Sequence, residues 1–139
     1  MSSLVTEIPF AAVDAAQEHF ERRLGFETDC SDVYQSLKDG PDFVLVDVRG
    51  PKLFAAGHVA GAVNIPHRTM TAQRMAEYPQ STLFVVYCAG PHCNGANKAA
   101  IRLLRLGFRV KEMIGGIAGW ADEGFDLETD DASRQASAV

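Results

Sequence analysis

Cys88 is the residue of this chain whose surroundings best suit nucleophilic chemistry. It follows the apolar run LFVVY at residues 83–87 and begins the segment CAGPHCNGANK at residues 88–98. A loop between a buried strand and a helix start offers unpaired backbone N–H groups and the positive end of a helix dipole, and both favour a thiolate over a thiol. Ligand sites of open α/β sheets lie outside the carboxyl ends of strands. We therefore predict that Cys88 is a nucleophile on a ligand-binding loop.

A second cysteine, Cys93, lies five positions after Cys88 and allows three interpretations. It is a resolving thiol that attacks a persulfide or sulfenate on Cys88 and closes a disulfide, or it is a structural residue at the start of the next helix. Alternatively, Cys88, His92 and Cys93 supply part of a metal site, but this spacing offers no convincing fourth ligand. We prefer the structural interpretation and expect neither a metal nor another cofactor.

The other polar and small residues of this segment are candidates for binding an anion or shaping the loop; they are Ala89, Gly90, Pro91, His92, Asn94, Gly95 and Lys98. Asn94 and Gly95 both tolerate left-handed backbone angles. Lys98 falls in the first turn of the predicted helix, where a cation opposes the helix dipole, so an anion-binding role would explain its position. His67 and Arg68 either rim the same pocket or are simply solvated.

The elements that must position these residues alternate along the chain. Near-continuous apolar runs predict strands buried on both faces at residues 43–48 and 83–87, with shorter strands at 26–29, 62–65 and 110–114. Helices are predicted at 9–24 with Gly25 as C-cap, between Asp29 or Ser31 and Gly40, after Pro51, and at 69–77, 97–106 and 117–123. Strands alternating with helices form βαβ units, so we predict a three-layer α/β/α domain with a mostly parallel sheet.

The chain divides into three segments. Residues 1–26 form an N-terminal helical extension, residues 27–128 the domain, and residues 129–139 a polar tail that we expect to be disordered. Phe10, Val13, Phe20 and Leu24 make an apolar stripe on the extension, which either packs on the domain or joins two copies into a homodimer.

Composition narrows the classes of function. The 139 residues carry a net charge of −5 and are 47% hydrophobic, which is the balance of a globular domain and argues against nucleic-acid or anionic-membrane partners. The N-terminus lacks the regions of a signal peptide, and three cysteines cannot form a closed disulfide framework. We expect a cytoplasmic protein with no membrane partner, in which Cys30 is a small, partly buried residue.

Several separate motifs resemble those of rhodanese-like domains. They are Asp47-Val-Arg49, the stretch from Phe54 to Pro66 (FAAGHVAGAVNIP), VVYC ending at Cys88, Leu106-Gly-Phe108, and IGGIAGW ending at Trp120. The resemblance covers residues 27–125 and implies five parallel strands and a loop cysteine that carries sulfur as a persulfide. A donor such as thiosulfate loads this cysteine, and a thiol or cyanide accepts the sulfur. By position, Cys88 is that nucleophile.

The chain also departs from the family pattern. Residues 89–97 contain no arginine or lysine to hold an anionic donor, the loop is about two residues longer than is usual, and Leu53 stands where many members have a glutamate. Among the supporting residues, we interpret Asp47 and Arg49 as a fold-stabilising pair, and His58 as a residue that hydrogen-bonds the backbone of a turn. The missing cation suggests that a persulfide donor serves better than thiosulfate.

We therefore expect a sulfurtransferase of the thiosulfate:cyanide type that uses Cys88, a small sulfur donor and a thiol acceptor. Two alternatives remain: a thiol redox module that cycles Cys88 and Cys93 between dithiol and disulfide, and a catalytically silent binding module. A phosphatase or arsenate reductase is disfavoured because no arginine closes the loop around an oxyanion.

Overall fold

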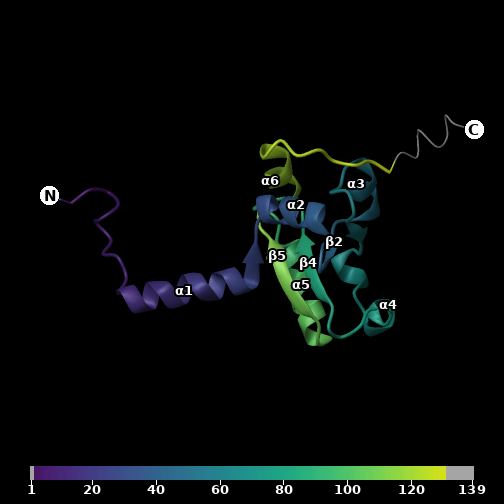
Figure 1. The fold of residues 1–139 in the computed structure, drawn as a ribbon, viewed down its shortest axis with the longest axis horizontal. Helices are drawn as coiled ribbons and strands as arrows, with labels where there is room; N and C mark the ends of the chain where they lie inside the picture. The colour runs from purple at the N-terminus through teal and green to yellow at the C-terminus, as the bar shows by residue number, and fades with distance from the viewer. Residues whose placement is uncertain (1, 131–139) are drawn as a thin grey trace, which may run out of the picture.

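The computed structural model describes residues 2–130, and a single parallel sheet lies at its centre (Figure 1). The strand order is β1-β5-β4-β2-β3, and every pair is parallel, as predicted. The strands are β1 (Glu27–Thr28), β2 (Val44–Asp47), β3 (Val63–Asn64), β4 (Leu83–Tyr87) and β5 (Arg109–Met113). β4 lies in the middle of the sheet, so its carboxyl end is flanked by strands on both sides. That position is where the sequence places Cys88.

Helices cover both faces of this sheet and complete the predicted three layers. They are α2 (Cys30–Asp39), α3 (Pro51–Ala56), α4 (Ala72–Met75), α5 (Gly95–Arg105) and α6 (Gly116–Asp122). On one face, Phe84 and Val86 of β4 pack with Ala99 and Leu103 of α5. On the other face, Val85 of β4 joins a second core that includes α2 and α6. This alternation assigns successive residues of β4 to opposite faces of the sheet.

Local signals explain where several helices begin. Asp29 caps α2 by accepting a hydrogen bond from the Asp32 N–H at 2.8 Å, and Pro51 begins α3 at a position that needs no N–H donor. The helix predicted at residues 69–77 is instead two short pieces, the 3₁₀ turn η1 (His67–Thr69) and α4. They separate because the Thr71 side chain accepts a hydrogen bond from the Arg74 N–H at 3.1 Å and so starts a new helix.

The N-terminal helix α1 (Val13–Phe26) extends away from the sheet, and none of its residues is buried (Figure 1). It starts later than the predicted Pro9 and continues through Gly25, which does not adopt a left-handed C-cap conformation. The helix ends because Glu27 enters β1 and pairs with Glu112 of β5.

The end of the described chain lies against the domain. Residues His58 and Glu128 exchange backbone hydrogen bonds of 2.9 and 2.8 Å, and the Asp130 N–H donates to the Ala55 carbonyl at 2.9 Å. The rest of the tail predicted at residues 129–139 lies outside the described residues. Among residues 2–130, no helix is both long and apolar enough to cross a lipid bilayer.

Candidate active site

Cys88 lies directly after β4, and its side chain is 7% exposed. It continues the alternation of Phe84 and Val86, so its side chain belongs to the core on the α5 side of the sheet. Ala96, in the first turn of α5, belongs to the same core. The strand therefore delivers the Cys88 sulfur to the beginning of the next helix, as the sequence predicts.

The loop after Cys88 is fixed to the beginning of α6 by two backbone hydrogen bonds. The Ile117 N–H donates to the Cys88 carbonyl at 3.0 Å, and the Ala118 N–H donates to the Ala89 carbonyl at 2.9 Å. Gly116 makes this approach possible, because a Cβ at this position would overlap the Cys88 carbonyl oxygen and lie 2.9 Å from the Gly90 nitrogen. Its φ of 58° also favours glycine.

In the sequence, Gly116 is visible only as part of the IGGIAGW motif, between the predicted strand at residues 110–114 and the predicted helix at residues 117–123. The available signal was the Gly115-Gly116 pair at that junction, but nothing local shows that the turn contacts a loop more than twenty residues earlier. Gly116 is therefore a site-shaping residue that only the tertiary structure reveals.

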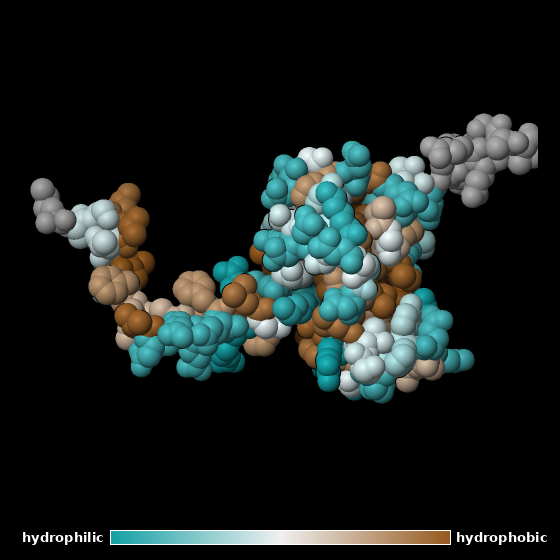
Figure 2. Space-filling model, viewed as in Figure 1, coloured by the Kyte–Doolittle hydropathy of each residue, from teal (hydrophilic) through white to brown (hydrophobic). Residues whose placement is uncertain are grey.

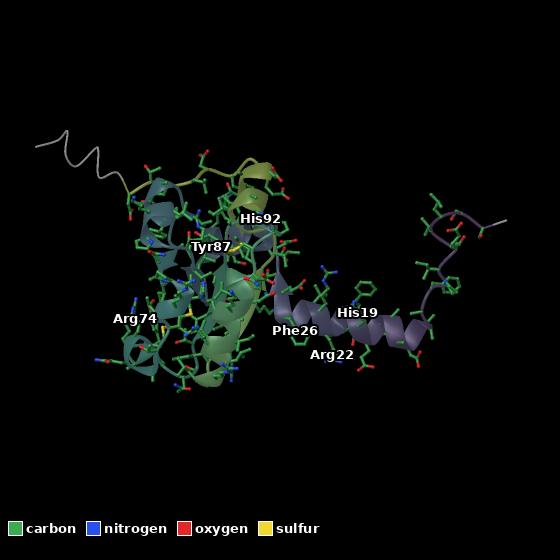
Figure 3. All side chains as sticks on the ribbon, turned by 180° about the vertical axis from the view of Figure 1, so that it is seen from behind. His19, Arg22, Phe26, Arg74, Tyr87 and His92 are labelled. Carbon is green, nitrogen blue, oxygen red and sulfur yellow. A yellow bond between two sulfur atoms is a disulfide. The ribbon has the colours of Figure 1, made fainter. Side chains whose placement is uncertain are left out.

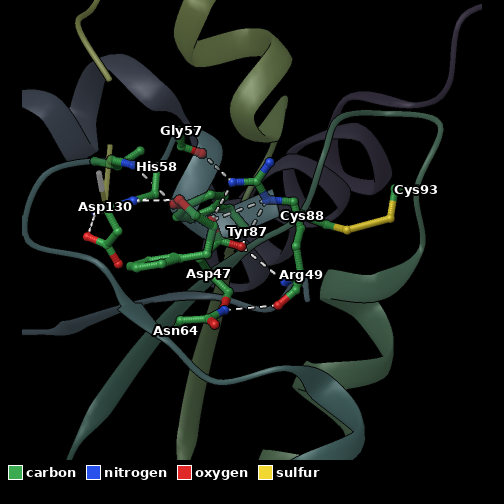
Figure 4. A network of polar contacts seen from close by, with 11 residues as sticks. Asp47, Arg49, Gly57, His58, Asn64, Tyr87, Cys88, Cys93 and Asp130 are labelled. Carbon is green, nitrogen blue, oxygen red and sulfur yellow. Dashed lines mark hydrogen bonds and ion pairs between the residues drawn. A yellow bond between two sulfur atoms is a disulfide. The ribbon is translucent and has the colours of Figure 1, made fainter. Parts of the chain in front are cut away.

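The sulfur atoms of Cys88 and Cys93 are joined in a disulfide, with 6.4 Å between the two Cα atoms (Figure 4). This contact places the two sulfur atoms together, as the resolving-thiol interpretation requires, and the roles of both cysteines stay predictions. The Gly95 N–H donates to Cys93 Sγ at 3.4 Å. Among residues 2–130, no three histidine, cysteine or carboxylate side chains form a group that could hold a metal ion.

Gly95 and Asn94 shape the loop for a different reason from the one predicted. Neither residue has a positive φ. Gly95 is instead needed for space, because a Cβ there would lie 2.8 Å from Cys88 Sγ and 3.4 Å from Cys93 Sγ. Asn94 is the N-cap of α5, but its side chain makes no capping hydrogen bond.

Backbone N–H groups of the loop remain available to a ligand. The Cys93 N–H donates to the Gly90 carbonyl at 3.0 Å. Within the described part of the chain, the N–H groups of Ala89, Gly90 and His92 have no protein acceptor. Such groups near the start of an eleven-residue helix can stabilise a thiolate or a persulfide anion.

Two cavities reach the two cysteines from different sides. The first, of about 650 Å³, is bordered by the carboxylates Asp29, Glu112 and Glu123, and we call it the acidic cavity. The second, of about 370 Å³, is bordered by Arg49, His67 and Arg68, and we call it the basic cavity. Both Cys88 and Cys93 line each of them.

The predicted loop residues divide between these cavities. Gly90, Pro91 and His92 line the acidic cavity, Ala89 and Gly95 line the basic cavity, and Asn94 lines both. Figure 3 shows His92 beside the disulfide. Lys98 lies in the wall of neither cavity. Because α5 turns it outward, its side chain is exposed. The arginines that border the site are instead Arg49, which follows β2, and Arg68, which follows β3.

Asp47 and Arg49 form a buried ion pair beside the site, with 2.7 Å between Arg49 Nη2 and Asp47 Oδ2 (Figure 4). The same Arg49 nitrogen donates to the Gly57 carbonyl at 2.6 Å. The Asn64 side chain donates to the carbonyls of Asp47 and Arg49 at 3.1 and 2.9 Å. This network connects β2, β3 and the end of α3.

His58 and Tyr87 extend this buried region. His58 Nδ1 lies 2.7 Å from the Phe54 carbonyl, which can only accept a hydrogen bond, so Nδ1 carries the proton. The Tyr87 hydroxyl accepts a hydrogen bond from the Val59 N–H at 3.1 Å. Burial, with a further contribution from Asp47, raises the pKa of Tyr87 above its usual range. His58 and Tyr87 line neither cavity, so they stabilise the fold around the site.

Cys30 lines the acidic cavity but differs chemically from Cys88. Its sulfur points to the carbonyls of Ile114 and Gly116, at 3.6 and 3.7 Å. Burial, assisted by the charges of Asp29 and Glu123, raises the pKa of Cys30 to about 11. The Cys30 side chain is therefore a neutral thiol at neutral pH and a poor nucleophile.

The chain is similar to proteins of known class. The family model of rhodanese-like domains matches residues 29–123. A sulfurtransferase of Allochromatium vinosum is 34% identical over 104 residues, which cover 73% of this chain and 92% of that protein. Thiosulfate sulfurtransferase 16, chloroplastic, of Arabidopsis thaliana is 34% identical over 91 residues, which cover 57% of this chain and 74% of that protein.

A solved structure is similar over more of the chain than the family model matches. The crystal structure of the BH2092 protein of Bacillus halodurans is 35% identical, with a TM-score of 0.82, over 86% of this chain and 88% of that one. The alignment therefore extends beyond residues 29–123.

Proposed function

Because the chain belongs to the rhodanese-like domain family, we propose that it is a sulfurtransferase that carries sulfane sulfur as a persulfide on Cys88. The observation that carries the proposal is the position of the Cys88 sulfur, at the end of the central strand and the start of α5. Relatives named as sulfurtransferases, at 34% identity, support the same reaction class.

In the first half-reaction, the Cys88 thiolate attacks the outer sulfur of a donor. With thiosulfate, a sulfur–sulfur bond to Cys88 forms, the sulfur–sulfur bond of the donor breaks, and sulfite leaves with the electron pair. The free N–H groups of Ala89, Gly90 and His92 can then hold the persulfide anion. In the second half-reaction, an acceptor thiolate or cyanide takes the outer sulfur and Cys88 returns as a thiolate.

A second candidate function, a thiol redox module, is favoured by the disulfide between Cys88 and Cys93. The Cys93 thiolate can attack Cys88 Sγ of the persulfide, which forms the disulfide and releases hydrosulfide. An external thiol then reduces the disulfide by two successive exchange steps and is itself oxidised to a disulfide. In this cycle the sulfur leaves as sulfide, whereas in the sulfurtransferase cycle it leaves on the acceptor.

The test is the intact mass of the reduced protein after exposure to thiosulfate or to a low-molecular-weight persulfide. We expect the wild-type protein to gain one sulfur atom that cyanide or a thiol removes. Cys88→Ser should gain none. Cys93→Ser should hold the added sulfur longer than the wild type, because the internal discharge step is missing.

Cys30→Ser is the matched control, since its buried neutral thiol should not carry sulfur. Sulfur gain by the Cys88→Ser variant, or no gain by the wild type with any donor, would overturn the sulfurtransferase proposal. Sulfide release that depends on Cys93 would select the redox cycle.

A further inference from the structure

The two cavities at the Cys88–Cys93 bond differ in charge, and this difference bears on which reactant approaches from which side. Both cysteines line both cavities, so a reactant in either cavity lies beside the same pair of cysteines. The inference below rests on the proposed function and deepens it by assigning a class of reactant to each side.

The acidic cavity holds three carboxylates from three elements. Asp29 precedes α2, Glu112 belongs to β5 and Glu123 follows α6. No lysine or arginine of the described chain lines this cavity, and Glu112 is paired only with the neutral side chain of Asn97, at 3.1 Å. The field of these carboxylates opposes a dianion such as thiosulfate and favours a positively charged reactant.

The basic cavity has the opposite character, although Arg49 is neutralised by Asp47. Arg68 is exposed and makes no ion pair within residues 2–130, so its guanidinium is available to an anion. His67 is beside it, and its Nδ1 is buried without a hydrogen-bond partner in the described chain. Burial and the nearby cations Arg68, Lys98 and Arg102 lower the pKa of His67. The positive charge on this side of α5 therefore belongs to the arginine and lysine side chains rather than to His67.

We propose that the two cavities separate the half-reactions. The anionic sulfur donor reaches Cys88 through the basic cavity. The acidic cavity receives the thiol that takes the sulfur or reduces the disulfide, and it selects thiols that carry a positive charge, such as small aminothiols. The lack of an arginine in the loop is then no defect, because the donor is attracted by Arg68 from the opposite side.

The acidic cavity can be tested without sulfur transfer. In the oxidised protein, an added thiolate attacks the Cys88–Cys93 disulfide, one cysteine leaves as a thiolate, and a second added thiol completes the reduction. The experiment compares the rate constants for cysteamine, which is cationic, and 3-mercaptopropionate, which is anionic. Their ratio in each variant is divided by the wild-type ratio, so the intrinsic reactivities of the two thiols cancel.

We expect Glu112→Gln and Glu123→Gln each to lower the cysteamine preference by about two- to fivefold, the effect of a surface charge near its partner. Glu21→Gln, which removes the same charge from the distant helix α1, should leave the ratio unchanged. An unchanged ratio in both cavity variants would overturn the proposal, whether or not the protein transfers sulfur.

The basic cavity is tested by the loading half-reaction. Arg68→Gln should slow the gain of sulfur from thiosulfate by about two- to fivefold and leave discharge to cysteamine unchanged. Arg105→Gln, at the far end of α5, is the control and should change neither step. Equal effects of Arg68→Gln and Glu123→Gln on both half-reactions would show that one entrance serves both reactants and would overturn the proposal. A wild-type protein that gains no sulfur contradicts the proposed function instead.

Discussion

At the scale of single residues, the site depends on two glycines as much as on its cysteines. Gly95 leaves space for the sulfur atoms of Cys88 and Cys93, and Gly116 lets the backbone before α6 approach the Cys88 carbonyl. At either position, a Cβ atom would collide with Cys88: with its sulfur at Gly95 and with its carbonyl oxygen at Gly116. The chemistry of Cys88 therefore depends on the absence of two Cβ atoms.

We predict that Gly116→Ala destabilises the protein more than Gly124→Ala does. Both glycines have a positive φ, 58° and 80°, so both substitutions incur the left-handed strain of about 1–2 kcal/mol. Only at Gly116 does the new Cβ overlap the Cys88 carbonyl, which adds about 1–3 kcal/mol; Gly124 has open space around it. Urea unfolding of the two variants measures this difference, and equal losses of stability would contradict it.

At the scale of elements, the site is formed where three chain segments meet. β4 ends at the cysteine, α5 begins beside its sulfur, and the start of α6 holds the loop through the Cys88 and Ala89 carbonyls. The Asp47–Arg49 pair performs the corresponding task for β2, because it ties the end of that strand to Gly57 and, through backbone carbonyls, to Asn64 of β3. The carboxyl edge of the sheet is thus held on both sides of Cys88.

We predict that Arg49→Met lowers the free energy of unfolding by about 3–5 kcal/mol, because it leaves the fully buried Asp47 carboxylate without its counterion. The exposed pair Arg74–Glu77 supplies the control, and Arg74→Met should cost less than about 1 kcal/mol. Adding Asp47→Asn to Arg49→Met should restore part of the loss, since the uncompensated charge is then absent. Denaturant unfolding of the four proteins measures these values, and a double variant no more stable than Arg49→Met would argue against this cause.

At the scale of the whole molecule, helix α1 stands out because the domain leaves its apolar side chains exposed. Figure 2 shows hydrophobic side chains along this helix and the segment before it. Val13, Phe20 and Leu24 lie on one face of α1 and are 84%, 58% and 70% exposed. Near the domain, this face continues into a groove of about 470 Å³ that Phe20 and Leu24 line together with Ile114.

We predict that this face binds α1 of a second copy of the chain. A two-fold arrangement lets each copy place its helix against the same face and groove of the other, so that both copies bury the stripe. Phe20→Glu with Leu24→Glu should therefore yield a monomer in sedimentation velocity at concentrations where the wild type forms a dimer. Ala15→Glu with Arg22→Glu places two carboxylates on the opposite face as a control and should leave the dimer intact. A monomeric wild type would contradict this prediction.

The sequence by itself determined the succession of strands and helices along the chain, the parallel sheet and the position of Cys88 at the end of a buried strand. These follow from local patterns: the apolar runs of β2 and β4, the Asp29 cap and the family motifs. Helix boundaries were less accurate at α1 and α4, where strand pairing by Glu27 and capping by Thr71 set the limits.

Only the tertiary structure decided which residues surround the cysteines. The approach of Gly116 to the Cys88 loop and the opposite charges of the two cavities depend on contacts between segments distant in sequence. Asp29, Glu112 and Glu123 come from three separate elements, and no spacing along the chain brings them together. Local patterns specify which element a residue enters, whereas the packing of elements specifies which residues meet.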